Sequence, residues 1–490
     1  MAKPNDTAYK NAEARRTRHA FSAGRGRALA YDALADWTVL HKGEKPIARL
    51  FHVAYLAKTR RQKPRPVTFV FNGGPGAASA YLHVGALGPR RVVFNRDGSL
   101  PPPPAQLSDN RESWLPFTDL VFVDPVGTGF SRTIPEESTS EDGVKADEKK
   151  GISEFWEVER DLESLGEFMQ QFLSRHQRWT APIFIAGESY GGFRVAKLAR
   201  LAQERYGIGL NGAILISPAI EFASILGSDY DLMHWVELLP TMAGAAFHHG
   251  RGTGENAQAA RGLAEEFAQG DYLQLLARGA SMPEAQRQRT IGHMAQLVGL
   301  DEALIDRAGG RIHRVVFARE LLRNKRRYCG IYDASLTAVD PFPDRISYEG
   351  PDPTLAAIDR LFRAGINAQL RQHLGVDTPL EYELLSGEVN RHWKTKDARF
   401  IRQQIGSMDD LRYGMVLNPH MQVAISHGHF DMVTPYFSSN RIIQHMKLDE
   451  SLQSNLHVSH YDGGHMFYSW DRSRKAFARD MQSFYARSVG

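Results

Sequence analysis

The stretch that decides the fold is APIFIAGESYGGFRVAKL, residues 181–198. Its first part is an apolar run that favours a β-strand, and the part from Arg194 onward has the composition and spacing of a helix. Between them lies Gly-Glu-Ser-Tyr-Gly at 187–191. Glycines two residues before and after a Ser leave room for a sharp, strained turn that lifts the hydroxyl out of the backbone. We therefore predict a strand, a nucleophile elbow at Ser189 and a helix, instead of an ordinary Gly-Ser loop.

Length and composition narrow the class of protein. The chain has 490 residues, 42% of them hydrophobic and 24% charged, with a formal net charge of +4 at pH 7. This length predicts two domains or one core with a large insertion. The small net charge gives no reason to expect a nucleic-acid partner.

The cysteine count and the apolar runs bear on the compartment. Cys329 is the only cysteine, so no intramolecular disulfide can form and a reducing compartment is the simplest setting. The sequence shows no signal-peptide core and no run of ~18 apolar residues that could span a bilayer. We expect a cytoplasmic protein without a membrane partner, or a periplasmic one if a leader was removed.

Strand-like and helix-like runs alternate along the first half of the chain. Two runs flank a turn and predict a hairpin, later runs predict buried strands, and one long amphipathic pattern predicts a helix before the elbow. The alternation favours an α/β architecture with a mostly parallel central sheet and helices on both faces. The predicted strands lie at 34–40, 48–55, 66–71, 120–124, 212–218, 421–426 and 456–458, and the helix lies within 154–178.

The chain divides into four predicted parts. Residues 1–27 are polar and without periodicity, which is typical of a flexible N-terminal arm. Residues 28–220 would form the first part of the core, and residues 401–490 its C-terminal part. Between them, residues 221–400 are helical in pattern, polar and poor in β-rich runs. We interpret this stretch as an inserted helical cap.

The loops after the last two predicted strands each supply a candidate partner for Ser189. Asp431 follows the first of these strands, and His465 follows the second, next to two glycines. The order Ser, acid, His is that of triads built on this architecture. His465 would take the proton of Ser189, and Asp431 would fix the imidazole tautomer. Asp462 is a rival acid, but it lies too close to His465 on one short loop for an easy contact with the ring.

Histidine pairs elsewhere do not predict a metal site. Adjacent residues such as His248 and His249 cannot both face one metal ion from a regular helix or strand. His427 and His429 lack an accompanying carboxylate-His motif on a helix. The basic run at 323–327 is typical of a solvated face. We expect no metal ion and no cofactor.

Five short blocks resemble, in order, the signature blocks of the serine carboxypeptidase family. The resemblance covers residues 30–220 and the last seventy residues, and it implies a disulfide-free, bacterial-type member. It further implies an α/β-hydrolase fold with an inserted cap and a cofactor-free enzyme that releases C-terminal amino acids from peptides. The blocks are NGGPG at 72–76, DPVGTGFS at 124–131, GESYGG at 187–192, GHFDMVTP at 428–435 and GGHM at 463–466.

The same resemblance implies roles for residues around the elbow. The backbone N–H groups of Gly74 and Tyr190 would form an oxyanion hole, which agrees with a helix N-terminus directed at Ser189. Asn72, Gly73 and Glu188 would hold the terminal carboxylate of the substrate, with Glu188 protonated so that it can donate a hydrogen bond. The partner is then a peptide substrate, and a homodimer stays open.

Three positions depart from the family pattern. Ala77 stands where the family has a cysteine, Ala86 where it has a second Glu of the carboxylate site, and Val70 where it has an aromatic residue. The missing cysteine agrees with a chain free of disulfides. The missing Glu keeps alternatives open, namely an esterase or acyltransferase on the same triad, or a non-catalytic binding module.

The loss of the second Glu also leads to an expectation about pH. Two carboxyl groups that share a site raise the pKa of one of them, and Glu188 lacks such a neighbour in this sequence. We expect its proton to leave at lower pH, so that a nearby cation, Arg194 or else Arg90 or Arg91, would be needed to bind a carboxylate. The rate would then follow His465 and rise toward neutral pH.

Overall fold

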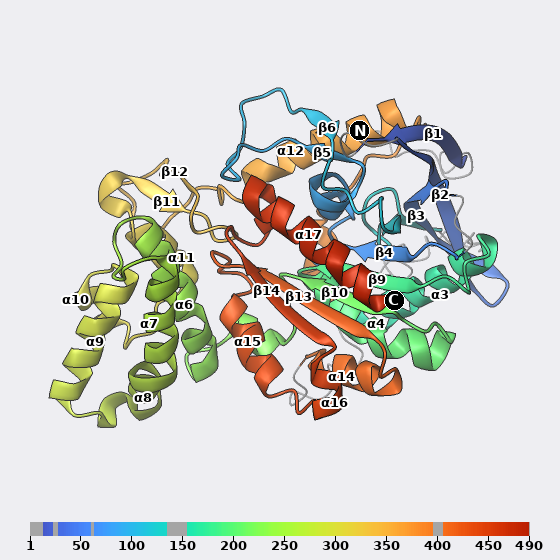
Figure 1. Ribbon diagram of the computed structural model, residues 1–490. Helices are drawn as coiled ribbons and strands as arrows, with labels where there is room; N and C mark the ends of the chain where they lie inside the picture. The colour runs from blue at the N-terminus through green and yellow to red at the C-terminus, as the bar shows by residue number, and fades with distance from the viewer. Residues whose placement is uncertain (1–12, 23–27, 60–62, 135–153, 395–404, 490) are drawn as a thin grey trace, which may run out of the picture.

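A ten-stranded sheet forms the centre of the molecule (Figure 1). The structure is a computed structural model that describes residues 13–22, 28–59, 63–134, 154–394 and 405–489. Across the sheet the strands follow the order β1 (Arg15–Phe21), β2 (Leu29–Lys42), β3 (Lys45–Ala57), β7 (Asp119–Val123), β4 (Val67–Phe71), β9 (Ile183–Glu188), β10 (Gly212–Ile216), β13 (Gln422–Gly428) and β14 (Leu456–Tyr461), with β8 (Arg132–Thr133) beside β3.

The strand directions confirm the predicted α/β-hydrolase fold. From β7 to β14 every pair of neighbours is parallel, whereas β1, β2, β3 and β7 pair antiparallel. The hairpin predicted from the sequence is formed by β2 and β3. The predicted elbow strand is β9, and it lies in the middle of the parallel part.

Apolar side chains cover both faces of the sheet, because successive residues of a strand point to opposite sides. In β4, Val70 joins one buried cluster, while Phe69 and Phe71 join the other. The first face is covered by α17, and the second by three helices (Figure 1). These helices are α17 (Asp471–Ser488) on the first face, and α3 (Val158–Arg175), α4 (Tyr190–Tyr206) and α14 (Met408–Leu417) on the second.

The N-terminal arm predicted at 1–27 is wrong for residues 15–21, which form β1 on the edge of the sheet. Phe21 is buried, and Arg16 donates to Asp32 of β2 at 2.5 Å. The high charge of this strand hid it in the sequence, although charged residues are usual on edge strands. The rest of the predicted arm lies outside the described residues, apart from a few flanking positions.

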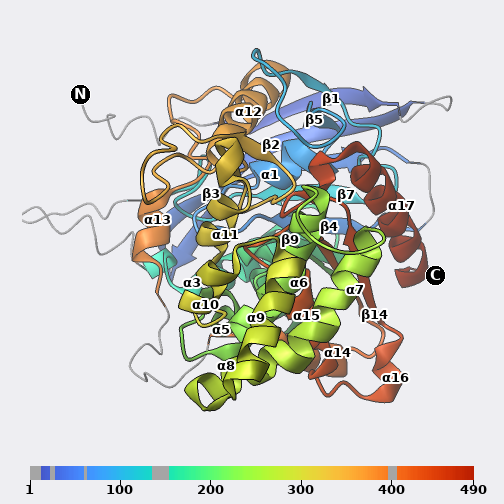
Figure 2. The same cartoon turned by 90° about the vertical axis from the view of Figure 1, so that its left-hand side faces the viewer.

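The insertion begins with a helical body that has its own apolar cluster. Its buried residues run from Trp235 to Ala334, and Figures 1 and 2 show its helices standing beside the sheet. The helices are α5 (Phe222–Leu226), α6 (Leu232–His248), α7 (Ala257–Phe267), η3 (Ala268–Tyr272), α8 (Leu273–Arg278), η4 (Gly279–Ser281), α9 (Glu284–Val298), α10 (Glu302–Arg307), α11 (Arg314–Glu320) and η5 (Arg323–Lys325), followed by the ribbon of β11 (Arg327–Cys329) and β12 (Thr337–Val339).

The last part of the predicted cap at 221–400 belongs to the main core, so the prediction of one cap is wrong there. Leu361 and Phe362 of α12 (Ala356–Asn367) join the same cluster as Val70, a residue of the sheet. A helical pattern predicts a buried face but does not tell which partner covers it. The remaining short elements are α1 (Ala80–Leu82), η2 (His83–Leu87), β5 (Arg90–Val92), β6 (Leu107–Asp109), η6 (Ala368–His373), α13 (Gly387–His392), α15 (Tyr436–Gln444), α16 (Glu450–Gln453) and η7 (Phe467–Ser469).

Two residues from the loop after β13 and two from α15 complete the cluster of the insertion. Phe430 and Met432 lie on either side of Asp431 in the sequence, and Tyr436 and Phe437 follow. The insertion therefore packs directly on the loop that carries the predicted acid. Among the described helices, none combines the length and apolar character needed to cross a membrane.

Candidate active site

Ser189 lies in the sharp turn between β9 and α4, as the sequence predicts. Its φ of +60° and ψ of −124° are unusual for a residue with a side chain, and such strain is typical of functional turns. The flanking glycines are required by contact. A Cβ on Gly187 would lie 2.0 Å from the carbonyl oxygen of Gly191, and one on Gly191 would lie 2.5 Å from that of Phe71. The nucleophile elbow is therefore present.

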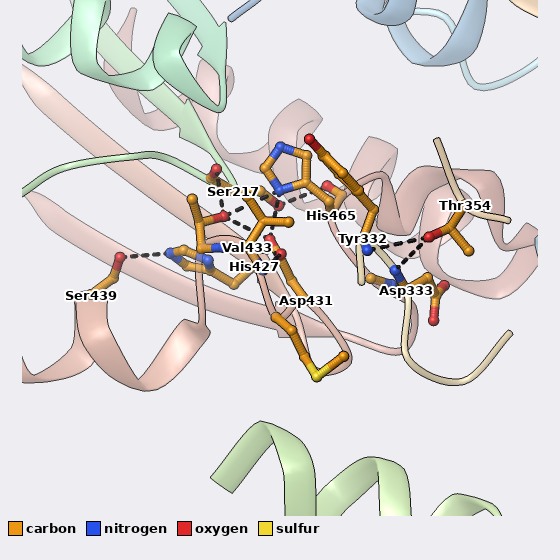
Figure 3. A network of polar contacts seen from close by, with 12 residues as sticks. Ser217, Tyr332, Asp333, Thr354, His427, Asp431, Val433, Ser439 and His465 are labelled. Atoms are coloured by element: carbon orange, nitrogen blue, oxygen red, sulfur yellow. Dashed lines mark hydrogen bonds and ion pairs between the residues drawn. The ribbon is translucent and has the colours of Figure 1, made fainter. Parts of the chain in front are cut away.

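His465 and Asp431 meet at the ends of the last two strands (Figure 3). His465 Nδ1 lies 2.7 Å from Asp431 Oδ2, and both side chains are buried. Asp431 also accepts hydrogen bonds from Val433 N at 2.8 Å and from Thr434 N at 3.0 Å, both on Oδ1. The hydroxyl of Thr434 donates to Oδ2 at 2.6 Å. The carboxylate is thus held in one orientation toward the imidazole.

Asp462, the rival acid, lies away from this contact. Its side chain is 45% exposed, and its carboxylate lies 4.0 Å from Arg472. The described residues give it no hydrogen bond to His465. The structure thus brings His465 together with Asp431 and not with Asp462.

The surroundings of His465 favour its protonated form. Burial alone would lower its pKa, but the charge and hydrogen bond of Asp431, with the charge of Glu188, raise the pKa above the ordinary value. A raised pKa makes the imidazole a stronger base. This is the direction that a proton acceptor for a serine hydroxyl needs.

Ser189 and His465 line one small cavity together with four other predicted site residues. The predicted residues are Asn72, Gly73, Gly74 and Glu188. Tyr190 is not among the lining residues, but its backbone N lies next to Gly73, since a Cβ on Gly73 would lie 2.6 Å from it. The structure thus assembles the elbow, the base and the Asn-Gly-Gly turn around one space.

The two predicted oxyanion donors are free to act. Gly74 has a φ of +99°, in the region that favours glycine. Within the described residues, neither Gly74 N–H nor Tyr190 N–H donates a hydrogen bond to a protein acceptor. Their role in binding an oxyanion stays a prediction.

Asn72 and Glu188 form a buried pair beside the cavity. Asn72 Nδ2 donates to Glu188 Oε2 at 2.5 Å, and Asn72 Oδ1 accepts from Leu82 N at 3.0 Å. Burial, the largest cause, raises the pKa of Glu188 to about 7. The expectation that this proton leaves at lower pH is therefore wrong. It considered the missing carboxyl neighbour but not the removal of the Glu188 side chain from solvent, which raises the pKa.

A tyrosine that the sequence did not single out lies next to Glu188. The Tyr468 side chain is fully buried. By distance and angle, neither the Tyr468 hydroxyl nor Glu188 Oε1 forms a hydrogen bond with any described residue. The carboxyl thus keeps one oxygen available.

The part of the chain around these residues is similar to known proteins. Residues 39–239 match the serine carboxypeptidase family. The resemblance seen in the sequence is confirmed over this stretch, which contains Asn72, Glu188 and the elbow.

Curated relatives agree with the family match. Serine carboxypeptidase-like 5 of Arabidopsis thaliana is 30% identical over 194 residues, which are 37% of this chain and 39% of that protein. Serine carboxypeptidase-like 13 of the same plant is 29% identical over 203 residues, 40% of this chain and 42% of that protein. The pheromone-processing carboxypeptidase KEX1 of Yarrowia lipolytica is 31% identical over 154 residues, 31% of this chain and 21% of that protein. The match spans about two fifths of the length of the two plant relatives.

The stretch 221–400 adds pocket residues that the serine carboxypeptidase blocks do not include. Tyr332, Leu355 and Leu385 line the cavity with Ser189, and the Tyr332 ring lies edge-on to His465 at 5.4 Å between centroids. Burial, the largest cause, raises the pKa of Tyr332 to about 12. No local pattern marks these residues, because only tertiary packing brings them to the pocket.

Arg194, predicted to contact the substrate, does not line the cavity, and that prediction is wrong. The side chain is 1% exposed, and its Nε lies 2.7 Å from Asp161 Oδ2. Its Nη1 donates to the carbonyl oxygen of Asn72 at 2.6 Å. The guanidinium therefore supports the turn from behind. Arg90 and Arg91 do not line the cavity with Ser189 either, and Arg90 contacts His373 and Asp109 instead.

Removing Arg194 should cost much stability. In Arg194→Ala, the carboxylate of Asp161 would stay buried without its partner, so we expect the free energy of unfolding to fall by about 3–5 kcal/mol. Urea unfolding followed by fluorescence measures the change. The matched control is Arg200→Ala on the same helix, where Arg200 pairs with Glu204 at 2.8 Å but is 41% exposed. It should lose at most about 0.5 kcal/mol, and equal losses would contradict the prediction.

Proposed function

We propose that this protein is a serine carboxypeptidase-like hydrolase that releases C-terminal amino acids from peptides. The observation that carries the proposal is the shared cavity of Ser189 and His465, with His465 bonded to Asp431 at 2.7 Å. The family match over residues 39–239 supports the same reaction class.

In the proposed mechanism, Ser189 Oγ attacks the carbonyl carbon of the last peptide bond while His465 takes its proton. The negative charge on the carbonyl oxygen would be bound by the N–H groups of Gly74 and Tyr190. His465 then gives its proton to the departing amino group, which leaves an acyl group on Ser189. Water, activated by His465, hydrolyses this ester and restores the serine.

Recognition of the terminal carboxylate would fall to Asn72, Gly73 and the protonated form of Glu188. Glu188 is 3% exposed, and burial raises its pKa to about 7. A neutral carboxyl can donate a hydrogen bond to the carboxylate of the substrate. A single buried Glu can thus keep its proton near neutral pH without the second carboxyl that Ala86 replaces.

Labelling with a fluorophosphonate tests the proposal. The reagent should form a covalent adduct on Ser189, found by mass spectrometry of the digested protein, and Ser189→Ala should give none. Release of free amino acid from blocked dipeptides identifies the reaction. Hydrolysis of esters alone, with no peptide cleaved, would favour the esterase or acyltransferase alternative. If the folded protein is not labelled, the proposal that it is a serine hydrolase is wrong.

The ratio of activity on a free acid to activity on its amide should report Glu188. Below pH 7 Glu188 is mostly protonated and binds the carboxylate, and as the pH rises through its pKa of about 7 the anion repels it. We expect the ratio of kcat/KM for a blocked dipeptide acid to that for its amide to fall by up to about tenfold per pH unit above that point. His465 affects both substrates and cancels in the ratio.

The variant Glu188→Gln provides the control for this pH dependence. Gln donates a hydrogen bond at every pH, so the ratio should become independent of pH between about 6 and 9. A ratio that still falls in Glu188→Gln would assign the effect to another group.

Two further proposals rest on the sequence. With Cys329 as the only cysteine, a cytoplasmic location is proposed and can be checked by cell fractionation. We also propose that the protein forms a homodimer, and the molar mass from light scattering would test this.

A further inference from the structure

A short segment of the insertion, residues 331–335, contacts both loops that carry the triad partners. We call it the bridging segment, and one residue separates it from β11. On one side it pairs with the acid loop, where Met432 N donates to Ile331 O at 3.1 Å and Ala334 N donates to Phe430 O at 2.9 Å. These two bonds hold the residues immediately before and after Asp431.

On its other side the bridging segment holds the base loop. His465 N donates to Tyr332 O at 2.6 Å, and Gly464 N donates to Asp333 Oδ2 at 2.9 Å. At position 464 of the base loop, this contact leaves no space for a side chain. A Cβ on Gly464 would lie 2.0 Å from Tyr332 O and 2.4 Å from Asp333 Cα. The glycine before His465 is therefore required by the insertion.

Asp333 bonds the base loop through its side chain. Its Oδ2 accepts from Gly464 N and, at 3.2 Å, from the Trp470 indole. Its Oδ1 accepts from Ser335 N at 3.0 Å and from the Ser335 hydroxyl, which closes a local turn. One oxygen thus shapes the segment, and the other crosses to the core. Figure 3 shows Asp333 next to Tyr332, on the far side of His465 from Ser217.

We propose that Asp333 is a positioning residue, whose carboxylate fixes the backbone at Gly464 and thereby the approach of His465 to Asp431. The inference rests on the proposed function, because it concerns the same triad. Asp333 is 6% exposed and accepts four hydrogen bonds from three residues, so its side chain has little freedom. Bonds from N–H and O–H groups to a carboxylate are among the stronger ones in proteins.

The expected effect follows from the sensitivity of catalysis to geometry. A shift of about 1 Å in a catalytic group can cost roughly 10²-fold in rate. In Asp333→Ala the base loop loses its side-chain anchor but keeps the backbone bond from His465 N to Tyr332 O. We expect roughly a 10²-fold loss in the rate constant for inactivation by a fluorophosphonate, measured per folded molecule.

The pH dependence of inactivation separates positioning from general destabilisation. The pKa of His465 is raised by Asp431, so a looser contact should lower it and move the midpoint of the rate to lower pH. Loss of folded protein lowers the amplitude without moving the midpoint. The titratable groups near His465 are Asp431, Glu188, His427 and Tyr332, and Asp333→Ala removes none of them. Asp333 is titratable too, since burial raises its pKa to about 6, but its charge is not among the causes that shift the pKa of His465.

Two further variants complete the test. Asp333→Asn keeps the volume but only one acceptor oxygen, so it should fall between wild type and Asp333→Ala, and it provides a reading if the Ala variant does not fold. The matched control is Asp340→Ala. Asp340 is also a buried insertion carboxylate, accepting from Phe342 N at 2.9 Å and lying 3.5 Å from Arg319, but none of its bonds reaches the triad loops.

The possible outcomes are distinct. Equal rate constants and equal midpoints in wild type, Asp333→Asn and Asp333→Ala would overturn the inference, as would an equal loss in Asp340→Ala. No reaction of the folded wild-type protein with the fluorophosphonate would instead overturn the proposed function. A large loss and a lower midpoint in Asp333→Ala alone would support the positioning role.

Discussion

Ser189→Ala and His465→Ala should each lower kcat by roughly 10⁶-fold, and the double variant should be hardly slower than either single one. The reason is that the hydroxyl and the imidazole act in one step: without the base the serine is a poor nucleophile, and without the serine the base has no proton to take. Their shared cavity places them for that step. Turnover of a blocked dipeptide by each purified variant measures the losses.

The comparison requires that all three variants fold. Circular dichroism and urea unfolding provide that control. Losses that multiply in the double variant would show that Ser189 and His465 work in separate steps, and another residue would then be the base.

Asp431→Asn should leave the fold intact and lower kcat by roughly 10⁴-fold. Two backbone N–H groups donate to Asp431 Oδ1, at 2.8 Å and 3.0 Å. In the variant, the amide oxygen should stay on these donors and place the NH₂ group against His465 Nδ1. His465 would then carry its proton on Nε2, the wrong tautomer to accept one from Ser189.

Asp462→Asn is the matched control for this prediction. It makes the same chemical change three residues before His465, but at a side chain that is 45% exposed, so activity should stay within about twofold of wild type. Kinetics of both variants on one substrate decide between the two acids. A larger loss in Asp462→Asn would mean that the acid is misassigned.

The elbow and the triad order could be predicted because their physical causes are local. Gly187 and Gly191 are required because a Cβ at either position would lie under 3 Å from atoms within or next to the turn. Such a requirement appears directly as glycines in a short sequence motif. Asp431 and His465 follow buried strands of a parallel sheet, whose ends meet at one edge. Sequence patterns therefore suffice for residues whose position depends on the strand before them.

Other features depend on burial and on distant packing, which no local pattern records. The predicted position of Arg194 near the elbow was right, but only the structure shows that Asp161 and the carbonyl of Asn72 occupy its guanidinium. The pKa of Glu188 follows from its burial more than from its neighbours. Asp333 lies 132 positions before His465, in a stretch whose composition gave no reason to select it.

Phe430 and Met432 pack into the apolar cluster of the insertion, so the loop that carries Asp431 depends on that packing. Asp431 lies between two residues whose burial depends on helices from the middle of the chain. A molecule with a complete sheet but an unpacked insertion would hold Ser189 on its elbow without a fixed acid for His465. A complete triad therefore requires a packed insertion as well as a complete sheet, and under the proposed function partly folded copies of the chain would be inert toward one another.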